Sequence, residues 1–139
     1  MGTTYKPNFM KIKLIQIPKI EEPRGNLSVI ENDCIPFEMK RVYYLYDVPS
    51  GAERGGHAHK KLQQFLIALS GSFDVVLHNG KEQKTVTLNK PNVGLLIESG
   101  TWRELNNFSS GAVCLVLASE VYLEADYIRD FDAFLDYKK

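Results

Sequence analysis

Residues 54–64 read Arg-Gly-Gly-His-Ala-His-Lys-Lys-Leu-Gln-Gln and are the most informative stretch of this chain. They hold two of the three histidines, two positions apart, between a Gly-Gly turn and the apolar run 65–69. Residues two apart on a β-strand point to the same face, so His57 and His59 should stand side by side, about 7 Å apart along the strand. Two imidazoles in one pocket are typical of a metal site or of a proton-transfer site.

Short apolar segments recur on both sides of this stretch, separated by Gly, Pro, Asn and Ser. Asn79-Gly80 between two of them indicates a hairpin, because both residue types tolerate positive φ. Many short strands without βαβ spacing favour a sandwich, barrel or jelly roll. The predicted strands are Lys13–Ile17, Leu27–Glu31, Arg41–Asp47, Gln64–Leu69, Ser72–His78, Lys84–Leu88, Gly94–Ile97, Arg103–Asn107 and Val113–Ser119.

One helix is predicted, from Glu124 to Tyr137. Its acidic start and its Lys138-Lys139 end match the helix dipole, and we expect it to pack on the outside of the sheet. No linker or repeat interrupts the chain, so residues 1–139 are expected to form a single domain. The apolar residues that fall on one face of this helix are Tyr127, Ile128, Phe131, Phe134 and Leu135.

The composition excludes several kinds of partner. The 17 Lys and Arg balance 17 Asp and Glu, which gives no reason to expect nucleic acid or an anionic membrane. No apolar run approaches the ~18 residues of a membrane span, and the N-terminus lacks a signal-peptide pattern. Cys34 and Cys114 lie far apart without CxxC spacing, as expected for reduced thiols in a cytoplasmic protein.

The histidine spacing resembles the first motif of the cupin superfamily of small jelly-roll proteins. That motif continues after His-x-His with a Glu and then a Gly, and here Gln64 and Gly71 stand at those positions. A counterpart of the second cupin motif lies near residues 91–102, and Arg103 stands where its histidine is expected. Two of the four usual metal-ligand positions therefore carry Gln and Arg.

These two replacements favour acid–base chemistry over a metal centre. Catalytic metals take about three protein ligands, normally His, Cys or carboxylate. An amide is a weak substitute, and a guanidinium stays protonated and has no lone pair to give. A metal site would need Glu98 or Glu104 to complete it, and both histidines could instead be packed residues without a function. We expect no metal and no other cofactor.

Basic and aromatic residues around the histidines indicate an anionic ligand that includes a ring. Guanidinium groups bind phosphate in a bidentate manner, and tyrosines offer a flat face and a hydroxyl. Any one of these residues alone would be an ordinary surface charge or a strand residue, but the cluster suits a nucleotide diphosphate. The residues concerned are Arg24, Arg41, Arg54, Lys60, Lys61 and the tyrosines of the segment 43–46.

Within the cupins, the chain is similar to the bacterial sugar-nucleotide 3,4-ketoisomerases, whose relatives include deoxysugar 3,5-epimerases. The resemblance implies cofactor-free conversion of dTDP-4-keto-6-deoxy-D-glucose to a dTDP-3-keto-6-deoxyhexose, for surface glycans such as lipopolysaccharide or S-layer, or for antibiotic sugars. It also implies a homodimer that exchanges the strand near Lys13–Ile17, so that Arg24 acts in the neighbour's site. The segments that carry it are Pro23–Leu27, Ile35–Phe37, Lys40–Tyr44, Arg54–Gln64, Leu69–Ser72, Val93–Leu95, Trp102, Asn107–Ser110, Val116–Ser119 and Asp126–Arg129.

The chemistry of a 4-ketose suggests roles for these residues. The carbonyl acidifies the C3 hydrogen, so a neutral imidazole with a pKa of about 6.5 can remove it and leave an enediol. We expect His59 to move the carbon-bound proton and His57 the oxygen protons, or the reverse, with Tyr43 or Arg103 stabilising the oxyanion. Expected on the substrate are Arg24, Arg54 and Lys60 at the pyrophosphate, Arg41 at the nucleotide, and Gln64, Trp102, Arg103 and Glu104 elsewhere, with Trp102 equally placed as a core wall.

Three other functions stay open: a 3,5-epimerase, a metal-dependent cupin enzyme, and a cupin that binds sugar nucleotides without catalysis. In the resembling family the positions of Arg24 and Arg103 vary, and the residues here favour a gluco over a galacto product only slightly.

Overall fold

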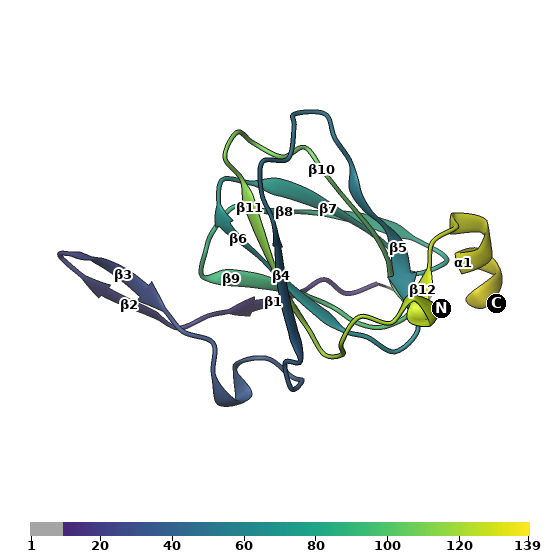
Figure 1. The fold of residues 1–139 in the computed structure, drawn as a ribbon, viewed down its shortest axis with the longest axis horizontal. Helices are drawn as coiled ribbons and strands as arrows, with labels where there is room; N and C mark the ends of the chain where they lie inside the picture. The colour runs from purple at the N-terminus through teal and green to yellow at the C-terminus, as the bar shows by residue number, and fades with distance from the viewer. Residues whose placement is uncertain (1–9) are drawn as a thin grey trace, which may run out of the picture.

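The structure, a computed structural model, describes residues 10–139 (Figure 1). Short 3-10 helices span Asn32–Cys34 and Glu124–Asp126, and the helix α1 spans Phe131–Tyr137. The strands are β1 (Lys13–Gln16), β2 (Lys19–Glu22), β3 (Gly25–Ser28), β4 (Arg41–Leu45), β5 (Arg54–His59), β6 (Gln64–Ser70), β7 (Phe73–His78), β8 (Gln83–Leu88), β9 (Val93–Ile97), β10 (Trp102–Asn106), β11 (Val113–Ala118) and β12 (Tyr127–Ile128).

Two five-stranded antiparallel sheets form the body of the molecule (Figure 1). One has the order β1-β9-β6-β11-β4 and the other β12-β5-β10-β7-β8. Alternate residues of β7, Phe73, Val75 and Leu77, are buried between the sheets, where they join apolar side chains of β6, β9 and β11. The predicted all-β jelly roll with a C-terminal helix is confirmed.

The strand β6 is apolar on both faces because both faces are buried. Leu66 and Ala68 point into the core between the sheets, whereas Phe65 and Ile67 point outward to a second cluster that includes Ile35. This outer packing requires a glycine on the neighbouring strand β9. A Cβ atom on Gly94 would lie 2.0 Å from the Phe65 ring.

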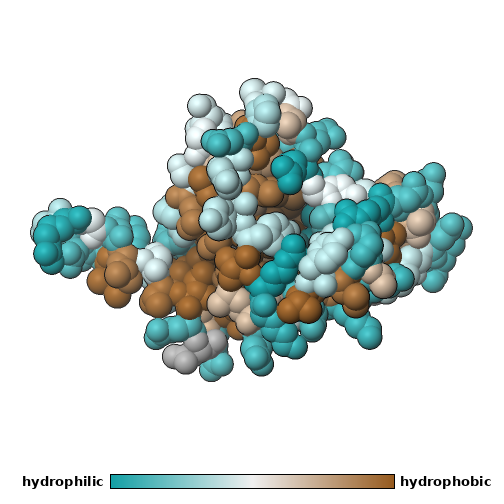
Figure 2. All heavy atoms as spheres, in the orientation of Figure 1, coloured by the Kyte–Doolittle hydropathy of each residue, from teal (hydrophilic) through white to brown (hydrophobic). Residues whose placement is uncertain are grey.

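The strands β2 and β3 form a two-stranded ribbon that projects from the body (Figure 1). The sequence predicted a strand at Leu27–Glu31, but the strand is Gly25–Ser28, and its partner β2 was not predicted. Ile20 and Leu27 pair across the ribbon and are 55% and 56% exposed. In Figure 2 the tip of the ribbon is hydrophilic, and hydrophobic side chains gather towards its base.

The C-terminal helix is shorter than predicted, since only Phe131–Tyr137 is helical. Tyr127 and Ile128 instead form β12 opposite His59 and Ala58 of β5. The helix begins after Asp130, whose side chain accepts a hydrogen bond from the backbone N–H of Ala133. The apolar spacing from Tyr127 to Leu135 predicts one helical face, but Tyr127 and Ile128 belong to a strand in the structure. Within residues 10–139, no helix has the length and apolar character needed to cross a membrane.

Candidate active site

Two glycines place the histidine strand. Between the pairs Arg54–Leu105 and His57–Arg103, β5 has two residues where β10 has one, so β5 carries a bulge. Gly55 has φ +96°, and a Cβ there would lie 3.0 Å from Leu105 Cδ1. The extra residue shifts the two-residue alternation by one, so that Arg54 and His57 face the same pocket although they lie three positions apart.

The predicted arrangement of the two histidines is confirmed. The ring centroids of His57 and His59 lie 4.8 Å apart, with the planes nearly perpendicular at 85°. His59 is fully buried and His57 is half-buried. Among residues 10–139, neither Nε2 atom has a hydrogen-bond partner, although both are buried. Both Nε2 atoms are therefore unused by the described chain, and His57 is the histidine that borders a cavity.

The opposite ring nitrogen of His59 contacts a carboxylate that the sequence analysis did not assign to the site. His59 Nδ1 lies 3.2 Å from Asp126 Oδ2. The same carboxylate accepts hydrogen bonds from the backbone N–H groups of Lys61, at 2.8 Å, and Leu62, at 3.2 Å. A carboxylate can only accept, so neutral His59 carries its proton on Nδ1 and leaves a lone pair on Nε2.

Tyr127 packs against both imidazoles. Its ring centroid lies 4.9 Å from that of His57 and 4.3 Å from that of His59. The guanidinium carbon of Arg129 lies 4.1 Å from the centre of the same ring, and Arg129 pairs with Glu124 at 2.7 Å. The segment 124–129 thus packs against the histidine pair, an arrangement that the predicted helix did not include.

The residues at the two replaced cupin positions bind each other. Arg103 is 1% exposed and donates hydrogen bonds to Gln64 Oε1 and to the Thr101 carbonyl oxygen. Gln64 Nε2 donates in turn to Tyr43 Oη at 3.1 Å. The hydroxyl of Tyr43 accepts this bond, so its own proton remains available to a ligand.

This donor set does not fit a metal. A guanidinium has no lone pair to offer a cation, and the Gln64 carbonyl oxygen is already bound to Arg103. Among residues 10–139, no three His, Cys, Asp or Glu side chains come together to hold a metal ion.

The surroundings keep both imidazoles neutral. Burial, and then the Arg103 guanidinium, lowers the pKa of His57 to about 3 and that of His59 to about 4. Asp126 acts in the opposite direction on the pKa of His59. Burial raises the pKa of Tyr43 and lowers that of Arg103 to about 10, so at neutral pH the phenol is protonated and the guanidinium is charged.

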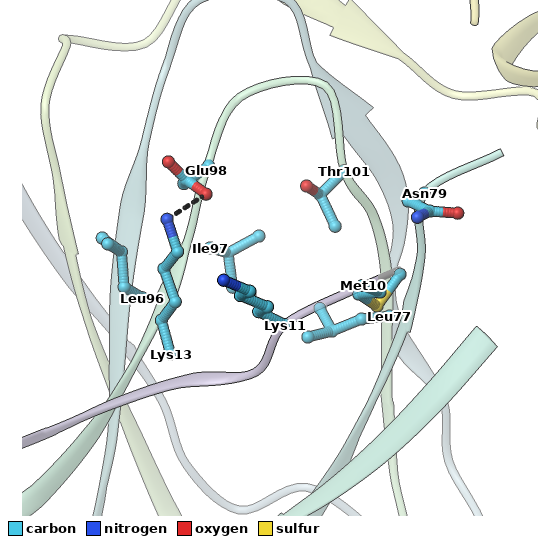
Figure 3. Close-up of a pocket in the computed structure, with 9 residues that line it drawn as sticks. All are labelled: Met10, Lys11, Lys13, Leu77, Asn79, Leu96, Ile97, Glu98 and Thr101. Atoms are coloured by element: carbon cyan, nitrogen blue, oxygen red, sulfur yellow. Dashed lines mark ion pairs between the residues drawn. The ribbon is translucent and has the colours of Figure 1, made fainter. Parts of the chain in front are cut away.

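A pocket of 90 Å³ opens beside His57. A larger hollow of 280 Å³ lies elsewhere, where the segment from Met10 to Lys13 passes Leu77, Leu96 and Thr101 (Figure 3), and its Lys13 is paired with Glu98 at 2.8 Å. The pocket beside His57 combines polar groups with an apolar wall and is the better candidate for chemistry, although His59 does not line it. Its lining residues are Tyr43, Leu45, Arg54, Gly55, His57, Gln64, Leu66, Leu105 and Val116.

Two residues predicted to contact the substrate lie on the other face of β10. Trp102 and Glu104 flank the inward-facing Arg103 and therefore point outward. The Trp102 indole N–H donates to Glu104 Oε2 at 2.8 Å, and its ring packs against Phe131 and Phe134 of α1. The structure thus makes Trp102 part of the outer packing, which was the other role considered for it.

The predicted basic residues are only partly brought together. The Arg41 guanidinium lies over the rings of Tyr43 and Tyr122, at 4.6 and 5.4 Å, and its buried Nη1 has no hydrogen-bond partner within residues 10–139. Lys60 lies just beyond the end of β5 and is exposed. Arg24 is 89% exposed at the turn of the β2–β3 ribbon, paired with Glu22.

The tyrosines of β4 and its flank divide between two faces. Tyr43 faces the pocket, whereas Tyr44 and Tyr46 are 59% and 61% exposed. Of the tyrosines in the segment 43–46, only Tyr43 therefore lines the candidate site in this chain.

The family model FdtA, described as WxcM-like, C-terminal, matches residues 10–139. The chain belongs to this family. It is 47% identical over 129 residues to the TDP-4-oxo-6-deoxy-alpha-D-glucose-3,4-oxoisomerase of Aneurinibacillus thermoaerophilus. The match covers 92% of this chain and 93% of that relative. The predicted resemblance to 3,4-ketoisomerases is thereby confirmed.

Solved structures of 3,4-ketoisomerases agree with this assignment. A 3,4-ketoisomerase from Helicobacter canadensis has a TM-score of 0.90 and 47% identity, over 94% of this chain and 98% of that one. A variant of the 3,4-ketoisomerase QdtA from Thermoanaerobacterium thermosaccharolyticum, in complex with TDP-4-keto-6-deoxyglucose, has a TM-score of 0.89 and 45% identity, over 91% and 93%. A dTDP-4-dehydrorhamnose 3,5-epimerase from Bacillus anthracis is only 15% identical, with a TM-score of 0.74, over 90% of this chain and 81% of that one, and shares the fold alone.

Proposed function

We propose that this protein is a sugar-nucleotide 3,4-ketoisomerase that converts dTDP-4-keto-6-deoxy-D-glucose to a dTDP-3-keto-6-deoxyhexose. The observation that carries the proposal is the pair of neutral imidazoles, one buried and one half-buried, each with a buried Nε2 that has no partner within residues 10–139, beside a buried guanidinium. Such a pair can move protons between neighbouring carbons and oxygens without a redox cofactor. The related 3,4-ketoisomerases support the substrate class.

The proposed reaction moves two protons and shifts one electron pair within the substrate, so that C3 is oxidised, C4 is reduced and no external oxidant or reductant is needed. His59 Nε2 takes the C3 proton, and the C3–H electron pair forms the C3–C4 double bond of an enediolate whose charge lies on O4. His57 takes the proton of the C3 hydroxyl and delivers one to O4. His59 then returns its proton to C4, which leaves a carbonyl at C3 and a hydroxyl at C4. Each histidine ends in its starting protonation state.

The charge that develops on O4 needs a partner in the pocket. The Arg103 guanidinium is a fixed positive charge, and the Tyr43 hydroxyl has a proton to donate because Gln64 supplies its accepted bond. Donors that are already in place stabilise an oxyanion without reorganisation at the moment of reaction. Arg54, which lines the same pocket, would hold the pyrophosphate, with Arg41 at the nucleotide.

A homodimer would complete the site. The β2–β3 ribbon exposes Ile20 and Leu27 on an isolated two-stranded element, which is a marginal structure in water. A second copy of the chain would cover this apolar surface and receive Arg24 near its histidines. In the single chain, β1 pairs with β9 of the same chain. The exchange of the strand near Lys13–Ile17 between two chains stays a prediction. The free thiols of Cys34 and Cys114 suit the reducing cytoplasm, where we place the enzyme.

The test is proton NMR of chelator-treated protein with dTDP-4-keto-6-deoxyglucose in D₂O. The expected result is loss of the C3 proton signal and a new 3-keto spectrum, whose C4 couplings give the configuration of the product. Deuterium at both C3 and C5 with inversion would identify an epimerase instead. Activity that chelation abolishes and a divalent metal restores would overturn the metal-free mechanism.

His59→Asn is the matching variant, because it keeps a polar side chain but removes the base. It should abolish turnover while dTDP binding persists. His78→Asn is its control, since His78 packs against Phe131 of the outer helix and bonds to the Gly80 N–H, away from the pocket.

A further inference from the structure

The run Asp126-Tyr127-Ile128-Arg129 packs against the histidines, yet the proposed reaction uses no group from it. Its position is fixed from two sides. Tyr127 and Ile128 pair with β5, and the Asp126 carbonyl oxygen accepts a hydrogen bond from the Lys60 N–H at 3.0 Å. Ile128 is buried with Phe134 of α1 on the outer face of the sheet. A well-anchored backbone therefore presents the Asp126 side chain to His59.

The two histidines differ in whether a carboxylate of this run lies beside them. His59 Nδ1 has the Asp126 carboxylate at 3.2 Å, whereas among residues 10–139 no carboxylate pairs with His57. A proton taken up on His59 Nε2 would create an imidazolium next to a negative charge. A proton taken up on His57 would create one that faces Arg103, and the only opposite charge assigned to it within residues 10–139 is that of the exposed Glu124, with which it forms no ion pair. The first cation is the more stable of the two.

We propose that Asp126 is a positioning residue, which fixes the Nδ1–H tautomer of His59 and thereby makes His59 the carrier of the carbon-bound proton. The proposal rests on the ketoisomerase function and deepens it. The backbone N–H groups of Lys61 and Leu62 hold the carboxylate itself in place, so its orientation does not depend on the histidine. His57, without a carboxylate, is left to move the hydroxyl protons.

The variant Asp126→Asn tests this role with little change of shape. With its oxygen at the position of Asp126 Oδ1, the amide still accepts the bond from the Lys61 N–H. Its NH₂ group then takes the position of Oδ2, where it loses the bond from the Leu62 N–H, carries no charge and can donate to His59 Nδ1. The control is Asp130→Asn, which removes a carboxylate from the same segment and keeps an N-cap residue for α1.

The first readout needs no turnover. Long-range ¹H–¹⁵N NMR of histidine-labelled protein reports which ring nitrogen is protonated, and with only three histidines the signals can be assigned by single replacements. We expect the Nδ1–H form for His59 in the wild-type protein and in Asp130→Asn. Asp126→Asn should shift His59 towards the Nε2–H tautomer. An Nε2–H form in the wild-type protein, or no shift in the variant, would overturn the proposal even if the protein proved to have another activity.

The second readout separates positioning from a merely structural role. Asp126→Asn should lower kcat by about 10²–10⁴-fold, the usual contribution of a general base, without changing the affinity for dTDP. The acid limb of kcat/KM should also move to lower pH, because Asp126 opposes Arg103 and Arg129 in setting the pKa of His59. Wild-type isomerisation with an unchanged kcat and pH profile in Asp126→Asn would leave the function standing and refute the role of Asp126.

Discussion

The hydroxyl of Tyr43 offers a direct test of how the pocket handles the oxyanion. It accepts a hydrogen bond from Gln64 Nε2 at 3.1 Å, and Gln64 is itself held by Arg103 through Oε1. The variant Tyr43→Phe removes the hydroxyl and leaves the ring in place. We expect two separate effects, one on catalysis and one on stability.

The sizes of both effects follow from the contacts. Loss of one preorganised donor to a developing oxyanion lowers kcat by about 10²–10³-fold, or about 2.7–4 kcal/mol in activation free energy. Gln64 is 2% exposed, so its amide N–H is left without a partner in a dry site. An unsatisfied buried donor costs about 1–3 kcal/mol of the free energy of unfolding.

The catalytic effect is measured as the rate of C3 deuteration and of 3-keto product formation, and the stability effect by urea unfolding at fixed protein concentration. Tyr44→Phe is the control, since Tyr44 is 59% exposed and lies on the other face of β4. A Tyr43→Phe enzyme with wild-type kcat would refute the donor role. Reduced stability with unchanged kcat would restrict Tyr43 to the support of Gln64.

Three further predictions concern pH, packing and backbone. Because burial and Arg103 hold the pKa of His59 at about 4, kcat/KM should persist through the ordinary imidazole range near 6.5 and decline only as pH falls towards 4; a midpoint at 6.5 in the pH profile would contradict this. Trp102→Ala should cost about 3–5 kcal/mol in urea unfolding but leave dTDP affinity unchanged while the variant is folded, and weaker binding at equal stability would restore Trp102 as a ligand contact. Gly55→Ala should lower the free energy of unfolding by about 1–3 kcal/mol and should also lower kcat, because Gly55 has φ +96° and lies close to Leu105. Gly56→Ala is the control, since a Cβ there would meet nothing within 4 Å, and it should change neither quantity.

The strands and the histidine pair could be predicted because their signals are local. Apolar runs between turn residues located most strands to within about two residues, and the i, i+2 spacing placed both imidazoles on one face. The alternation of side chains along a strand also predicts the outward direction of Trp102 and Glu104. If Arg103 points inward on a strand, its two neighbours must point outward.

The remaining parts of the site depend on contacts that no local pattern encodes. Asp126 and His59 are 67 residues apart along the chain, and their contact follows from the pairing of β12 with β5. The apolar spacing from Tyr127 to Leu135 fits one helical face, yet a strand followed by a capped helix buries the same residues. The bulge at Gly55 is a third case, because a two-residue alternation without it would place Arg54 on the face opposite His57.

The segment from Glu124 to Arg129 is the last part of the site to be synthesised, after every strand of both main sheets except β12. The two main sheets can therefore hold His57 and His59 in place while this segment is not yet paired with β5. Such a state has both imidazoles in place but no acceptor for His59 Nδ1. If Asp126 sets the tautomer of His59, that tautomer therefore depends on the docking of the C-terminal segment against β5.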